Sequence, residues 1–117
     1  MQAKKRMKAR IKFNGKEIEI DDIVKCYSFK KFKGLMFTSK EKANALLFDF
    51  NGPCKQAIHS LFVSYPFLAI WLNEGKISEF KLVSPNTAVV KPENEFTQLI
   101  EIPMNEKYKE VVNLFLS

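Results

Sequence analysis

The chain has 117 residues, of which 46% are hydrophobic and 27% are charged, a balance typical of one soluble globular domain. No stretch holds the roughly 20 consecutive apolar residues of a membrane-spanning helix. The basic start lacks the apolar core of a secretory signal. We therefore expect a cytoplasmic protein that makes no membrane contact. Cys26 and Cys54 match neither a zinc-ligand spacing nor a CxxC pair, so we expect two reduced thiols, with a single disulfide as the alternative.

The net charge of +6 lies in the N-terminal third. Residues 1–33 hold eleven Lys and Arg against four acids, whereas residues 34–117 hold eight against nine. We expect residues 1–7 to form a basic N-terminal tail and residues 8–117 to form a single globular domain.

The first predicted element is a hairpin. Residues 8–13 and 16–20 each alternate apolar and polar side chains, and Asn14-Gly15 between them suits a type I′ turn. Asp21-Asp22 is expected to end the second strand, and residues 23–28 to form a third. Gly34 suggests a bend, after which Thr38 or Ser39 could cap a short helix over residues 40–45.

Short strands are predicted for most of the remaining chain. Their expected ranges are 46–50, ended by Asn51-Gly52-Pro53, then 56–63, 67–72, 77–83, 87–90 and 96–102. Residues 73–76 are a predicted hairpin loop in which Gly75 takes a left-handed conformation.

The last element is an amphipathic helix over residues 105–116, with Asn105 as its N-cap. Its apolar side chains recur at helical spacing: Tyr108, Val111, Val112 and Phe115. We therefore predict a mainly β fold, at the border of α+β. It is one compact domain with a curled or barrel-like antiparallel sheet, a C-terminal amphipathic helix and room for one short internal helix.

Six short boxes, in order, resemble an archaeal-like member of the uncharacterised family known as domain of unknown function 192. They are GLMF at 34–37, LFDF at 47–50, IHSLFVSYPF at 58–67, IWLNEGKI at 70–77, Leu82 with Pro85, and LIEIP at 99–103. The family-motif positions are Gly34, Leu35, Met36, Phe37, His59, Phe62, Pro66, Gly75, Glu101 and Pro103. The family usually carries an arginine where this chain has Thr38, and an aspartate where it has Leu68. The resemblance implies no established activity.

The residues predict no catalytic, cofactor or metal site. His59 is the only histidine and is expected to hydrogen-bond to the backbone. Cys54 and His59 are five residues apart, and no motif organises them as a nucleophile and base. The four glycines lie in predicted turns rather than in a phosphate-binding loop. The acidic residues mostly fall on predicted outer faces.

The basic N-terminal third is the strongest functional indication. Clustered cations interleaved with aromatic residues suit phosphates and stacked bases. A nucleic-acid contact would use Lys4, Lys5, Arg6, Lys8, Arg10, Lys12, Lys30, Lys31 and Lys33. No nucleic-acid-binding motif accompanies them, and a solubilising edge strand and tail is the alternative reading.

We therefore expect a protein of unknown biochemical function that acts as a non-catalytic binding or accessory domain, monomeric or weakly dimeric. Weak nucleic-acid binding is the first alternative. The second is small-ligand binding, or an unrecognised enzyme, in an aromatic-lined cleft. The aromatic residues, eleven of them Phe, could instead fill the interior.

Overall fold

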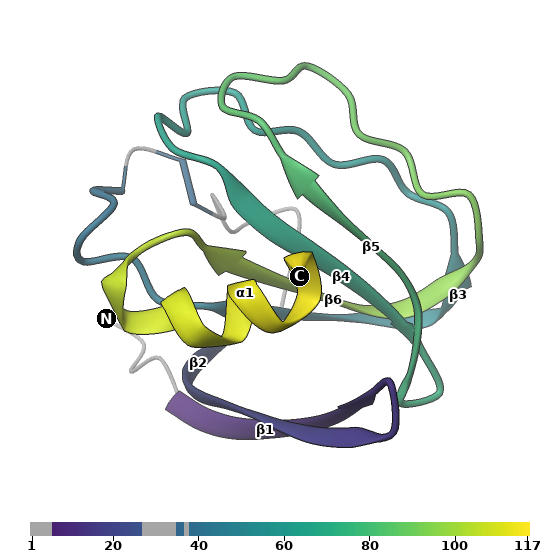
Figure 1. Ribbon diagram of the computed structural model, residues 1–117. Helices are drawn as coiled ribbons and strands as arrows, with labels where there is room; N and C mark the ends of the chain where they lie inside the picture. Colours follow the sequence, from purple (N-terminus) through teal and green to yellow (C-terminus); the bar gives the residue numbers. More distant parts are fainter. Residues whose placement is uncertain (1–5, 27–34, 37) are drawn as a thin grey trace.

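A computed structural model describes residues 6–26, 35–36 and 38–117 and contains one curled sheet with a C-terminal helix (Figure 1). The strands are β1 (Arg6–Phe13), β2 (Lys16–Cys26), β3 (Leu46–Cys54), β4 (Phe67–Asn73), β5 (Lys76–Val83) and β6 (Phe96–Pro103). A short 3-10 helix η1 (Glu106–Tyr108) leads into α1 (Lys109–Leu116). The predicted mainly β fold is confirmed, with six strands in the described part of the chain, fewer than the ranges predicted.

The sheet order is β1-β2-β3-β6-β4-β5, so β1 and β5 are its edges and β6 lies inside it. All neighbouring strands are antiparallel except β2 and β3, which pair in parallel over three residues. The sheet curls until its two edges approach each other, and the rings of Phe13 on β1 and Phe80 on β5 lie 5.3 Å apart. The result is an open half-barrel.

The β1–β2 hairpin forms as predicted, with Asn14 and Gly15 both at positive φ, 52° and 76°. Asp22 does not end the strand, contrary to expectation. It lies at φ 53° in a bulge, where the register between β1 and β2 shifts by one residue. The bulge lets both Ile20 and Ile23 turn to the same buried cluster. β1 begins at Arg6, so the last two residues of the expected tail belong to a strand.

The concave face of the sheet is filled by the C-terminal helix, and we call it the helix-covered face. Tyr108, Val112 and Phe115 pack into a cluster with apolar side chains from every strand. Phe115 stacks on Phe13 at 4.4 Å between ring centroids and meets Phe80 edge-on at 5.2 Å. The aromatic side chains therefore fill this side of the sheet rather than lining a hollow.

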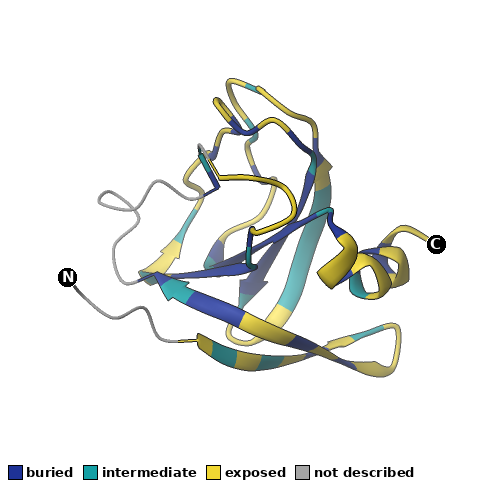
Figure 2. Ribbon diagram, turned by 90° about the vertical axis from the view of Figure 1, so that its left-hand side faces the viewer, coloured by how far each residue is buried: buried dark blue, intermediate teal, exposed yellow. Residues whose placement is uncertain are grey.

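The opposite face is covered by the long connections of the chain, and we call it the loop-covered face. Its buried cluster combines sheet residues such as Phe48 and Trp71 with Leu35, Val63 and Tyr65 from the loops. Figure 2 shows the buried residues along the middle of the sheet, between α1 on one side and the loops on the other. The sheet is thus buried on both faces, and β4 (FLAIWLN) is buried from Phe67 to Leu72.

Two predicted strands are loops. Residues 56–63 and 87–90 pair only at a single bridge, Ile58 with Val90. The fully buried Ser60 ties the two segments together instead. Its N–H donates to the carbonyl of Thr87 at 2.8 Å, and its Oγ donates to the carbonyl of Ser84 at 2.6 Å and accepts from the N–H of Thr87 at 2.7 Å. These bonds replace a regular ladder.

The short helix expected over residues 40–45 is a turn at residues 40–42 followed by irregular chain. The side chain of Asn105 explains the difference, because its Nδ2 donates to the carbonyls of Lys40 at 2.8 Å and Ala43 at 3.0 Å. The helix predicted over residues 105–116 is divided into η1 and α1. Asn105 is the N-cap of η1, since its Oδ1 accepts from the N–H of Tyr108 at 3.2 Å, whereas α1 begins after Tyr108 without a side-chain cap. The buried side-chain amide of Asn105 therefore fixes the backbone both at residues 40–43 and at the start of η1.

Asn51-Gly52-Pro53 was expected to end its strand but lies within β3, where the pairing with β6 is interrupted between Asp49 and Cys54. The hairpin between β4 and β5 forms as predicted. Glu74 and Gly75 both take positive φ, at 52° and 80°.

Candidate functional site

The feature of the loop-covered face that best suits a site is a buried acid, Glu101. It lies on β6, where Ala69 on β4 and Leu46 on β3 stand directly opposite it. Leu46, Ala69 and the neighbouring Leu99 all belong to the loop-covered cluster, so the carboxyl points into apolar surroundings. Only 4% of Glu101 is exposed. The sequence predicted that the acidic residues fall mostly on outer faces, and Glu101 is an exception that it did not predict.

Burial raises the pKa of the Glu101 carboxyl to about 8. Within the described residues, no cation or hydrogen-bond donor lowers the pKa of this carboxyl. The group is therefore mostly protonated at neutral pH and ionises only in weakly alkaline solution or when a positive charge comes beside it.

Two hydroxyl groups join the loops over this face. The hydroxyls of Tyr65 and Thr38 share a hydrogen bond, and Thr38 Oγ1 donates to the carbonyl of Leu35 at 2.6 Å. Burial raises the pKa of the Tyr65 hydroxyl, the bond with Thr38 opposes that rise, and the charge of Glu101 adds to it. Tyr65 is thus electrostatically coupled to Glu101.

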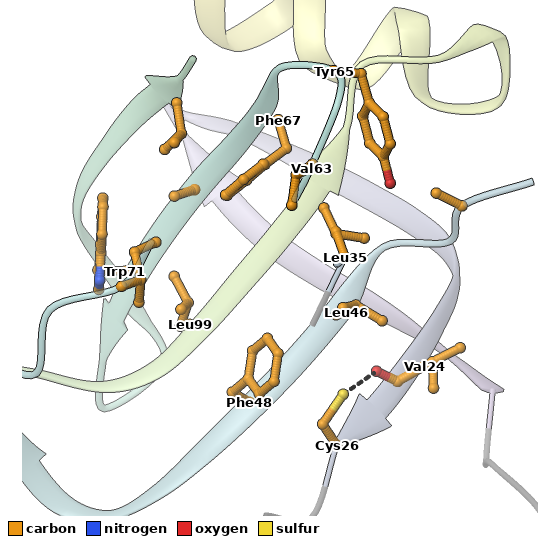
Figure 3. Close-up of a cluster of buried hydrophobic side chains, with 14 of the residues drawn as sticks. Val24, Cys26, Leu35, Leu46, Phe48, Val63, Tyr65, Phe67, Trp71 and Leu99 are labelled. Atoms are coloured by element: carbon orange, nitrogen blue, oxygen red, sulfur yellow. Dashed lines mark hydrogen bonds between the residues drawn. The ribbon is translucent and has the colours of Figure 1, made fainter. Parts of the chain in front are cut away.

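Trp71 places an unsatisfied polar group on the same face. Figure 3 shows it at one end of the cluster, with Tyr65 at the other and Phe67 between them. The indole Nε1 is buried and, among the described residues, is the one buried side-chain nitrogen or oxygen without a hydrogen-bond partner. The Nζ of Lys81 lies 5.9 Å from the centre of the ring. Trp71 pairs with Leu99, two residues from Glu101.

The family-motif positions do not gather into one site. Glu101, Leu35 and Pro103 are buried, Met36 and Pro66 are half-buried, His59, Phe62 and Gly75 are exposed, and Gly34 and Phe37 lie outside the described residues. Thr38 bonds to Tyr65 on the loop-covered side, whereas Leu68 is fully buried on the helix-covered side. The two positions where the resembled family is polar thus belong to opposite faces of the sheet.

Among the described residues, no hydrogen bond joins His59 to Cys54. The Nδ1 of His59 accepts a hydrogen bond from the N–H of Leu61 at 3.2 Å, which is the expected backbone contact. Cys54 is half-buried at the end of β3, and no disulfide joins it to Cys26. No three His, Cys, Asp or Glu side chains in the described part of the chain lie close enough together to hold a metal ion.

The described part of the basic region is largely balanced by acids. Lys8 Nζ lies 3.0 Å from Glu19, and Arg10 Nε lies 3.4 Å from Glu19 and 3.8 Å from Glu17. Across residues 6–22, five Lys and Arg face four Asp and Glu, a net charge of +1. Arg6 and Lys12 are exposed on the same strand. Lys4, Lys5, Lys30, Lys31 and Lys33 lie outside the described residues.

Comparison with known proteins finds no matching family model and no matching curated protein. Two solved structures share the fold. A putative transcription regulator from Sinorhizobium meliloti 1021 is 16% identical, with a TM-score of 0.72 over 94% of this chain and 87% of that one. A protein of unknown function from Novosphingobium aromaticivorans is 13% identical, with a TM-score of 0.68 over 92% of this chain and 79% of that one.

At these identities the likeness establishes the curled-sheet fold and no specific function. No described helix is long and apolar enough to cross a membrane.

Proposed function

We propose that the protein is a non-catalytic binding domain whose ligand site is the loop-covered face around Glu101. The observation that carries this proposal is the buried carboxyl on an inner strand, which has no counter-charge among the described residues. A buried acid of this kind costs folding stability, and perturbed, buried titratable groups concentrate at functional sites.

The arrangement supports binding better than catalysis. A general base or nucleophile needs a partner within hydrogen-bond reach and an oriented third group. Within the described residues, His59 is exposed, and the half-buried Cys54 packs against the loop-covered cluster without a hydrogen bond to Glu101. Membership of the family known as domain of unknown function 192, a cytoplasmic location and a monomeric or weakly dimeric state remain predictions from the sequence.

Native mass spectrometry of the purified protein tests the proposal. We expect the mass measured under native conditions to exceed the denatured mass by that of a bound ligand, and Glu101→Gln to remove the excess. Glu95→Gln is the matched control, because Glu95 is exposed just before β6. A wild-type protein without excess mass, or an excess that Glu101→Gln retains, contradicts the proposal.

A further inference from the structure

The chemistry of the loop-covered face limits what can bind there. A carboxylate surrounded by apolar side chains is stable when it is protonated or when a cation pairs with it. An anionic ligand would add repulsion to the cost of burial. A metal ion fits poorly, because Ca²⁺ and Mg²⁺ take about six or more oxygen ligands and no cluster of three acidic or metal-ligating side chains exists in the described residues.

The surroundings of Glu101 are suited to an organic cation. Ala69, the side chain directly opposite on β4, is the smallest in its row and is flanked on the same face by Phe67 and Trp71. Diagonal neighbours across a strand pair lie within reach of long and aromatic side chains. Aromatic rings attract cations at their faces, and the Trp71 ring already has Lys81 Nζ near it.

We infer that this face binds a small organic cation, a primary amine or a guanidinium compound. Its charge pairs with the Glu101 carboxylate, and its carbon chain lies among Phe67, Trp71 and Tyr65. The inference rests on the proposed function and names its ligand class. Because Glu101 is only 4% exposed beneath the loops, the ligand is enclosed when bound. The hydroxyls of Tyr65 and Thr38 share a hydrogen bond on the same face.

Three probes of equal length separate charge from shape: n-butylamine, n-butanol and butyrate. Trp71 is the only tryptophan, so its fluorescence reports binding at this face. We expect butylamine to bind, butanol and butyrate not to bind, and Glu101→Gln to weaken butylamine binding by about tenfold or more. Glu95→Gln should bind butylamine as the wild type does. Circular dichroism checks that both variants are folded.

Proton release gives a readout that a purely structural role would not produce. Free Glu101 is mostly protonated at neutral pH, with a pKa of about 8, and must ionise to pair with the amine. Calorimetry in two buffers of different ionisation enthalpy should therefore show release of about one proton for each butylamine bound. Tyr65, the titratable side chain coupled to Glu101, stays protonated throughout because its pKa is raised. In Glu101→Gln this release should disappear.

The outcomes separate the inference from the proposed function. Equal binding of butanol and butylamine, without proton release, would overturn the cationic ligand class but leave a binding domain in place. Binding of none of the three probes also overturns the inference. The native mass spectrum then decides the proposed function separately.

Discussion

Replacing Glu101 with glutamine should remove the part of the pH dependence of folding stability that the Glu101 carboxyl causes. In the unfolded chain the carboxyl ionises near 4.5, and in the folded protein burial raises its pKa to about 8. Between these pH values the folded state keeps a proton that the unfolded state has lost. The free energy of unfolding therefore falls as pH rises through this window and levels off above it.

The size of the effect follows from the two pKa values. Each pH unit between 4.5 and about 8 costs about 1.36 kcal/mol, so the full loss is about 5 kcal/mol. This is an upper limit, because water or loop movement that reaches the carboxylate lowers the cost. We expect glutamine, which is uncharged and of similar size, to raise stability by about 2–5 kcal/mol at high pH and by little at low pH.

Urea unfolding followed by Trp71 fluorescence measures this at about pH 5 and about pH 9. The difference between Glu101→Gln and wild type isolates the contribution of Glu101, because the other titrating groups are common to both proteins. Glu95→Gln, at an exposed position, should show the same small difference at both pH values. A Glu101→Gln difference that is equal at the two pH values would refute a buried, neutral Glu101.

Four further predictions concern packing and charge. Phe115→Ala should lower the free energy of unfolding by about 3–5 kcal/mol, because it removes the ring at the centre of the aromatic contact between the two sheet edges. Leu114 is exposed on the same helix, so Leu114→Ala should have little effect. A small loss of stability for Phe115→Ala would contradict this packing. Asn105→Ala should cost about 1–3 kcal/mol in urea unfolding. Asn105→Asp keeps the helix cap but loses the amide donor to the loop, so it should recover only part of that stability; full recovery would deny the loop contact a role. Ser60→Ala should speed hydrogen exchange in residues 84–90 without changing exchange in the sheet, and unchanged protection there would refute its role as the tie between the loops. Replacing Lys8 and Arg10 with Gln should leave the salt dependence of single-stranded oligonucleotide binding unchanged, because their charges are already paired. Replacing Lys30, Lys31 and Lys33 with Gln should flatten that salt dependence. No binding at low salt would exclude nucleic acid as a ligand.

Local chemistry predicted the turns and caps of this fold. Asn14-Gly15 takes positive φ at both positions because Gly has no Cβ and the short polar side chain of Asn can hydrogen-bond to the local backbone, and Gly75 does the same as Gly15 in the second hairpin. Asn105 caps η1, the 3-10 turn that leads into the C-terminal helix, through a contact only three residues away. Contacts between residues this close in the sequence depend on local residues alone, so the sequence was sufficient to predict these turns and this cap.

Signals of the same kind failed where distant residues supplied the partners. Thr38 or Ser39 could have capped a helix, but the amide of Asn105 binds the carbonyls that the turn presents. Residues 56–63 contain enough apolar side chains for a strand, yet Ser60 bonds to the segment around Thr87 instead. Asp22 continues β2 through a bulge because Ile20 and Ile23 both gain burial on the helix-covered face.

The sequence by itself determined a mainly β chain with a C-terminal amphipathic helix, because periodicity and turn residues act over a few positions. Only the tertiary structure decided the environment of Glu101. The box LIEIP places apolar residues on both faces of β6, which indicates a strand buried on both sides. The depth of that burial comes from loops whose side chains, such as Leu35 and Tyr65, lie far away in the sequence. The proposed site depends on that long-range cover.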